Sequence, residues 1–309
     1  MKLAKLCASA GLFLAGAGAV HAAPNCQGPG VYLQVLGSGG PELTDKRASS
    51  GYLIWHDGRA RILVDMGPGS LLRFEESGAR IEDLDMVLLT HLHVDHSADL
   101  PALVKAAFFT DRNRDLPVYG PTGNYLMPDT VAFVEALFSE STGAYRYLAG
   151  YLTGAEVFRV LPHNISAKLT QDVPVQQVSE GQVYKVTAVP VHHGPVPALA
   201  WRVDIDGHSL AFSGDMNGFG HTLPGLAAGV DVLVAHHAVP QGAVGAAHDL
   251  HMTPAEIGEI AAEAKVKQLV LSHRMNRTLG RESESQRVIR KRYAGPIAFA
   301  EDGQCFPLR

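Results

Sequence analysis

The residues best suited to chemistry lie in the stretch LLTHLHVDHSADLP, residues 88–101, which places three histidines and an aspartate within six positions. His91 and His93 follow a short apolar run that is typical of a buried strand, so both point to the same side of an extended chain. Asp95 and His96 fall where the chain turns into the next helix. Imidazole nitrogens and carboxylate oxygens are ligands of Zn²⁺ and similar ions. A metal site is therefore favoured over the alternative, a solvated polar loop.

Further candidate ligands occur downstream, each at the end of a β-rich run. His192 and His193 end one such run, Asp215 follows another, and His273 ends a buried one. Gly214 allows a close approach of the chain beside Asp215. Because strands in one sheet can project their terminal residues into one cleft, we expect these side chains to converge. Four separate donors at strand ends make the loop interpretation much less favourable.

The expected elements alternate between strands and helices, and no repeat is visible. A hairpin is predicted at 50–69 and strands at 30–40, 84–90, 182–191, 198–215, 230–237 and 267–273. Helices are predicted at 70–78, 97–109, 129–138 and 253–264. This order suits two packed sheets with helices outside them. Because Pro/Gly-rich linkers are absent, we expect one domain over residues 24–309.

The sequence resembles the metallo-β-lactamase-fold hydrolases in the order of its motifs, which are HxHxDH, the later histidine, the Gly-Asp pair and the final strand-end histidine. The resemblance covers most of the chain up to His273, and the branch it is most similar to contains ribonuclease Z, exported arylsulfatases and class II cyclic-nucleotide phosphodiesterases. The HxT element in HDLHMTPAEIGEIA, residues 248–261, supports that branch. The resemblance implies an α/β (α+β) fold, a four-layer αββα sandwich of two mixed β-sheets flanked by helices.

The same resemblance implies two divalent metal ions. The first would be bound by His91, His93 and His193. The second would be bound by Asp95, His96 and His273, with Asp215 bridging the two ions. The sequence alone leaves open whether His192 replaces His193. Zn²⁺ suits this nitrogen-rich set best, and Mn²⁺ or Fe also fits a His/Asp site.

Catalytic roles also follow from the resemblance. Asp95 would orient a metal-bound hydroxide as well as bind metal, and His251 of the HxT element would protonate the leaving alkoxide or stabilise its charge. His236 ends a strand, where it either orients a ligand or simply packs.

The first 23 residues have the features of a secretory signal peptide. Lys2 and Lys5 precede an apolar run, and small residues follow at VHAA, with cleavage near Ala22 or Ala23. A membrane anchor is the weaker alternative because the run is short and rich in glycine. We therefore expect a periplasmic or secreted protein with no membrane association after cleavage.

Two cysteines remain after the leader is removed, Cys26 and Cys305. In an oxidising compartment an even count favours a disulfide between them, and two free thiols are the alternative.

The charge composition and the spacing of the candidate ligands limit which binding partners are expected. The formal net charge is −5, and Lys and Arg form no basic stripe, so extended nucleic acid is not an expected partner. Only residues 194–214 separate His193 from Asp215, which leaves no room for the long tRNA-binding arm of ribonuclease Z enzymes. The sequence leaves a monomer and a homodimer open.

The predicted function is that of an exported dinuclear metal hydrolase of a small anionic ester: a phosphodiester, a cyclic nucleotide or an aryl sulfate. One alternative is a lactonase or lactamase-type hydrolase, although a bridging Asp215 argues against a β-lactamase. The other is a non-catalytic metal-binding protein, which the presence of both Asp95 and His251 disfavours.

Overall fold

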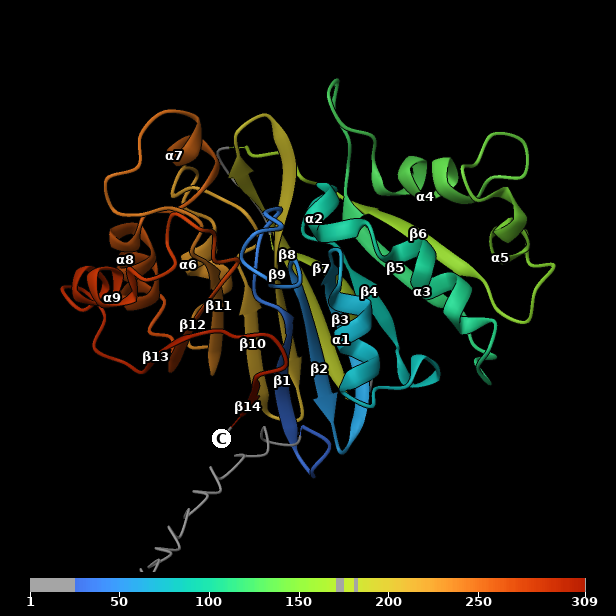
Figure 1. The fold of residues 1–309 in the computed structure, drawn as a ribbon, viewed down its shortest axis with the longest axis horizontal. Coiled ribbons are helices and arrows are strands. Elements are labelled where there is room, and N and C mark those ends of the chain that lie inside the picture. Colours follow the sequence, from blue (N-terminus) through green and yellow to red (C-terminus); the bar gives the residue numbers. More distant parts are fainter. Residues whose placement is uncertain (1–25, 171–174, 181–182, 309) are drawn as a thin grey trace, which may run out of the picture.

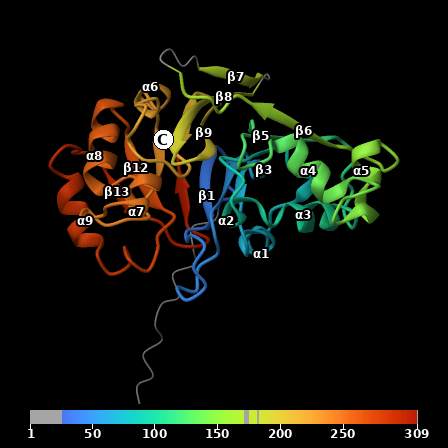
Figure 2. The ribbon, with the colours of Figure 1, turned by 90° about the horizontal axis from the view of Figure 1, so that it is seen from above.

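The computed structural model of the protein describes residues 26–170, 175–180 and 183–308. The predicted signal peptide, residues 1–23, lies outside the described residues. Two β-sheets pack face to face in the middle of the molecule, and helices cover both outer faces (Figure 1, Figure 2). The predicted four-layer αββα sandwich is confirmed. Among the described residues, no helix has both the length and the apolar character needed to cross a bilayer.

The first sheet has seven strands and is mixed. It is antiparallel from β14 to β3 and parallel from β3 to β6. Its spatial order is β14 (Cys305–Pro307), β1 (Val31–Gly37), β2 (Gly51–His56), β3 (Arg59–Met66), β4 (Met86–Leu88), β5 (Leu116–Pro121) and β6 (Val160–Ile165).

The second sheet also has seven strands. It is parallel from β13 to β10 and antiparallel from β10 to β7. Its order is β13 (Ile297–Phe299), β12 (Gln268–Ser272), β11 (Val232–His236), β10 (His208–Phe212), β9 (Val196–Ile205), β8 (Tyr184–His193) and β7 (Gln176–Glu180).

The helices divide between the two outer faces. The first sheet is covered by α1 (Ser70–Glu76), α3 (Leu100–Ala107), α4 (Thr130–Phe138) and α5 (Gly150–Thr153). The second is covered by α6 (Leu223–Leu226), α8 (Pro254–Glu263) and α9 (Glu282–Ile289). The short helices α2 (Val94–Ser97) and α7 (Ala246–Leu250) lie at the upper edge of the sandwich in Figure 1.

The helix predicted at 97–109 needs a correction. The structure has two helices there, α2 and α3, so Asp95 and His96 lie inside a helical turn. Pro101 explains the break, because proline lacks an N–H and is tolerated only in the first turn of a helix. The helix predicted at 253–264 is present as α8, and it begins with a capping box between Thr253 and Glu256.

Strand side chains alternate between two apolar layers. In β2, Tyr52 and Ile54 pack in the core between the sheets, whereas Leu53 and Trp55 pack under the helices of the first sheet. Strands buried on both faces have little room for unpaired polar groups, so polar side chains collect where strands end. The predicted disulfide between Cys26 and Cys305 is present, and it ties the chain before β1 to β14.

Candidate metal centre

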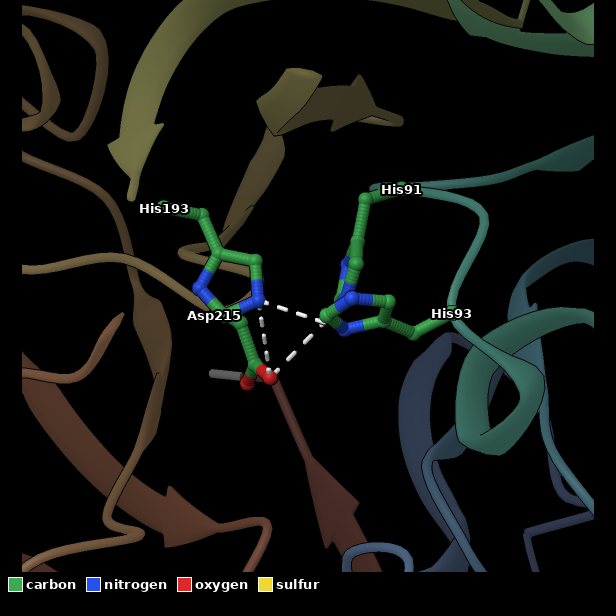
Figure 3. Close-up of side chains that lie close together, drawn as sticks. All are labelled: His91, His93, His193 and Asp215. Atoms are coloured by element: carbon green, nitrogen blue, oxygen red, sulfur yellow. Dashed lines mark hydrogen bonds and ion pairs between the residues drawn. The ribbon is translucent and has the colours of Figure 1, made fainter. Parts of the chain in front are cut away.

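The carboxyl ends of strands from both sheets bring the predicted ligands together at one edge of the sandwich. Two groups of side chains have ligand atoms within 4.8 Å of one another. The first group is His91, His93, His193 and Asp215 (Figure 3). The second group is His96, Asp215, His236 and His273. Asp215 belongs to both groups, which is the position expected of a bridging ligand.

The first group is built from three segments. His193 Nε2 lies 3.3 Å from His93 Nδ1 and 3.7 Å from Asp215 Oδ2. His91 Nε2 lies 3.8 Å from the same Asp215 oxygen. His193, the last residue of β8, belongs to this group, and its neighbour His192 does not (Figure 3). His192 instead contacts the ring of Phe219, with ring centroids 5.0 Å apart.

Asp95 and His236 both lie at the second group, and the sequence did not show that either could take the same ligand position. Asp95 Oδ2 lies 3.2 Å from His273 Nε2 and 3.5 Å from His96 Nε2, so it borders this group as expected for a ligand. His236 also reaches the group, but both of its ring nitrogens have partners. Its Nδ1 lies 2.8 Å from Asp215 Oδ1, and its Nε2 lies 3.0 Å from the Tyr52 hydroxyl. This geometry favours His236 as the residue that orients Asp215, and leaves the ligand position to Asp95.

Asp65, which the sequence analysis missed, holds two of the ligand histidines. Its fully buried carboxylate accepts hydrogen bonds from the Thr90 N–H at 2.7 Å and from the Thr90 hydroxyl at 2.8 Å. It also lies 2.8 Å from His96 Nδ1, while the Thr90 oxygen lies 3.1 Å from His91 Nδ1. Both rings therefore turn Nε2 towards Asp215. The available signal was a lone acidic residue near the end of the apolar strand β3.

His193 is oriented in a similar way by the backbone. Its Nδ1 lies 2.8 Å from the Leu250 carbonyl, which can only accept, so Nδ1 carries the proton. The lone pair is then on Nε2, which faces His93 and Asp215. Because Leu250 ends α7 and precedes His251, the ring also fixes the segment that carries the predicted proton donor.

The residues fit divalent cations. The Nε2 atoms of His91 and His96 are buried and have no hydrogen-bond partner within the described part of the chain, which is rare for buried nitrogen atoms. Both face the carboxylate of Asp215. Buried carboxylates need compensating positive charge, and neutral imidazoles with carboxylates form the donor set that Zn²⁺ and related ions bind.

The electrostatics agree with that fit. Burial raises the pKa of Asp215, but His273, His251 and His96 outweigh it and hold this pKa well below its ordinary value. Burial lowers the pKa of His96, but the charges of Asp95, Asp65 and Asp215 outweigh it and raise this pKa well above its usual range. Without a cation, protons on the histidines must balance the carboxylates, so cation binding and proton release are linked.

His251 borders this centre. Its Nδ1 is 3.8 Å from Asp215 Oδ1, and its ring centroid lies 5.5 Å from that of His193. Burial lowers the pKa of His251 to about 3, so its imidazole is neutral at neutral pH. A neutral ring can still donate a hydrogen bond to an oxygen atom that gains negative charge.

Comparison with known proteins identifies the family. A model described as a beta-lactamase superfamily domain matches residues 60–274, which include all the predicted metal ligands. The chain therefore belongs to the beta-lactamase superfamily. Within it the chain is similar to a ribonuclease Z of Mycobacterium sp. (strain KMS), with 32% identity over 259 residues, 79% of this chain and 84% of that protein. The predicted resemblance to the ribonuclease Z branch is confirmed.

Solved structures share the fold. A metallo-beta-lactamase fold protein from Bacillus subtilis matches with a TM-score of 0.67 and 22% identity, covering 89% of this chain and 98% of that one. The short form of human tRNase Z matches with a TM-score of 0.68 and 20% identity, covering 90% and 98%. These likenesses confirm the predicted metallo-β-lactamase fold.

Proposed function

We propose that the protein is an exported hydrolase that cleaves a small anionic ester with two divalent metal ions, which we assign as Zn²⁺. One observation carries the proposal: side chains from both sheets converge on Asp215, and two buried imidazole nitrogens there, His91 Nε2 and His96 Nε2, have no hydrogen-bond partner among the described residues. Bound ions would polarise the ester and lower the pKa of a coordinated water. His91, His93 and His193 would hold one ion, and Asp95, His96 and His273 the other.

The protein's own side chains supply positioning and proton transfer. Asp65 and Thr90 fix the rings of His91 and His96, and the Leu250 carbonyl fixes His193. Asp95 would accept a hydrogen bond from the attacking water and so aim it at the ester. His251, with Nδ1 unpartnered within the described residues, would donate to the leaving oxygen.

A cation near His251 supports an anionic substrate. The guanidinium of Arg277 is anchored through Nε, which donates to the Ala238 carbonyl at 2.6 Å. Its Nη2 lies 3.3 Å from Met275 Sδ, and among the described residues the guanidinium forms no ion pair with a carboxylate. Burial is the main cause of the low pKa of His251, and the charge of Arg277 adds a smaller contribution. An unpaired guanidinium beside a metal centre suits a phosphodiester, cyclic nucleotide or sulfate ester better than a neutral lactone.

The relatives named ribonuclease Z raise the question of RNA. Here the residues between His193 and Asp215 form only β9, β10 and short turns, so no arm projects from this part of the structure. The acidic net charge points the same way. We therefore place a small molecule, and not tRNA, in the centre.

A substrate panel on metal-loaded protein tests this function. The panel contains bis(p-nitrophenyl) phosphate, a cyclic nucleotide, an aryl sulfate, an acyl lactone and a precursor tRNA, each assayed with and without chelator. We expect chelator-sensitive turnover of at least one small anionic ester, and stoichiometric metal by elemental analysis. Turnover of only the lactone or only the tRNA, or no turnover at all, would contradict the proposal.

A further inference from the structure

Tyr52 carries a polar group in the apolar layer between the two sheets. The residue lies on β2 and is fully buried in a cluster that includes Ile54, Val64 and Phe212. Its ring centroid lies 5.6 Å from that of Phe212. Burying a phenol hydroxyl without a hydrogen bond costs free energy, so this position favours tyrosine over phenylalanine only if the hydroxyl has a partner.

The partner is His236, which lies on β11 in the other sheet. The Tyr52 hydroxyl oxygen lies 3.0 Å from His236 Nε2, and His236 Nδ1 lies 2.8 Å from Asp215 Oδ1. All three side chains are buried. A chain of hydrogen bonds therefore runs from the first sheet to the predicted bridging ligand, and Tyr52 is its outer end.

These partners determine where the His236 proton lies. A carboxylate can only accept, so Nδ1 carries the proton that bonds to Asp215. Bound cations would balance the charge of Asp215, and a fully buried imidazole is then most stable when neutral, with one proton. Nε2 therefore holds a lone pair, and the Tyr52 hydroxyl is the donor that satisfies it. Ser50 and Ser272 also lie near the phenol, where they can donate to its oxygen while its own proton bonds to His236.

The proton on His236 Nδ1 gives the two oxygens of Asp215 different surroundings. Oδ1 faces this N–H group and lies 3.4 Å from His273 Nε2. Oδ2 lies 3.6 Å from His96 Nε2 and 3.8 Å from His91 Nε2, so it faces one predicted ligand of each ion. Because the N–H group holds Oδ1, the carboxylate cannot rotate freely and Oδ2 stays between the two sets of ligands.

We propose that Tyr52 is a positioning residue of the metal centre: its hydroxyl keeps the His236 proton on Nδ1 and thereby fixes the orientation of Asp215. The inference rests on the proposed function, because it concerns the metal centre of that function, and it adds a residue that acts through His236 and not on an ion. Without the hydroxyl, the Nε2 lone pair would be buried with no donor, which destabilises this tautomer and weakens the hold on Asp215.

Nuclear magnetic resonance of the full chain, loaded with Zn²⁺ and labelled with ¹⁵N at histidine, locates the proton directly. The signals of His236 are assigned by their loss in His236→Gln. We expect a protonated Nδ1 and an unprotonated Nε2. A proton on Nε2, or a Zn²⁺ ion bound to Nδ1, overturns the proposal.

A double-mutant cycle tests whether Tyr52 acts through His236. We expect Tyr52→Phe to weaken Zn²⁺ binding roughly tenfold in competition with a chromogenic chelator. In a His236→Ala background the same substitution should have no further effect, because the acceptor of the bond is gone. Tyr293→Phe is the matched control and should leave the affinity unchanged, since it removes another buried hydroxyl, bonded to the Val266 carbonyl at 3.2 Å.

The outcomes separate this inference from the proposed function. Unchanged affinity in Tyr52→Phe, or an equal loss in both backgrounds, overturns the role of Tyr52 and leaves the proposed function standing. Stoichiometric Zn²⁺ without turnover of any ester contradicts the proposed function and leaves that role intact. Failure of the unaltered protein to bind Zn²⁺ overturns both. If Tyr52→Phe does not fold, the resonance measurement on the unaltered protein still decides the position of the proton.

Discussion

Asp65 Oδ2 lies 2.8 Å from His96 Nδ1, and both side chains are fully buried. This contact, together with the bonds from Thr90, sets which nitrogen of the ring faces Asp215. A residue that binds no metal itself therefore determines the geometry of one that is predicted to do so.

Asp65→Asn should weaken metal binding without unfolding the protein. The amide keeps the shape of the side chain and can accept from Thr90, but it lacks the charge that holds His96. We expect metal affinity to fall roughly 10–100-fold, measured by competition with a chromogenic chelator. Asp204→Asn, which alters a surface pair with Arg202, should leave metal affinity unchanged. Equal affinity in the two variants would contradict the role of Asp65.

His251→Ala should slow hydrolysis while metal content stays near normal. Loss of a proton donor typically costs roughly 10²–10⁴-fold in kcat. The measurement is kcat beside elemental analysis of the same sample. His221→Ala, which removes an exposed histidine paired with Glu263, serves as the control. Loss of metal together with activity would refute the assigned role.

Arg277→Gln should discriminate between charged and neutral substrates. Without the guanidinium we expect KM for an anionic ester to rise about tenfold, since one charge-assisted contact contributes about 1.5–3 kcal/mol at most. KM for a neutral acyl ester or lactone should change little. Arg287→Gln on α9 is the matched surface change. A parallel rise for both substrate types would mean that Arg277 acts on the fold and not on substrate charge.

Removal of the disulfide should lower stability more than it affects the metal centre. Replacing Cys26 and Cys305 with serine frees the chain before β1 from β14. Disulfides contribute about 2–4 kcal/mol in typical cases, so we expect a clear drop in the midpoint of denaturant unfolding. Metal content per folded molecule should stay constant. An unchanged midpoint would show that strand pairing alone holds these ends.

Much of the centre could be predicted because its ligands follow buried strands. An apolar run followed by a polar residue marks a strand end, and His193, Asp215 and His273 all stand there. The resemblance then supplied the pairing of ligands with ions, which no spacing could give. The choice between His192 and His193 needed the structure, because adjacent residues on a strand face opposite ways and the sequence does not show which side is occupied.

Other features depend on contacts between distant segments. Asp65 reaches Thr90 and His96 only because β3 and β4 are neighbours in the first sheet. The position of His236 between Tyr52 and Asp215 requires the two sheets to meet face to face. The prediction of a single helix at 97–109 was wrong for a local reason: Pro101 lies in the first turn of α3, so the chain forms two helices there in spite of its helical spacing.

The origin of the ligands has a consequence for assembly. His91, His93 and His96 come from the first sheet's segment, whereas His193, Asp215 and His273 come from the second. Neither half of the polypeptide carries a complete coordination set, so a chain whose halves have folded but not docked offers only low-affinity partial sites. Tight binding of the ions would therefore occur only after the two sheets have packed together. A bound ion would then stabilise the packing by linking ligands from both sheets.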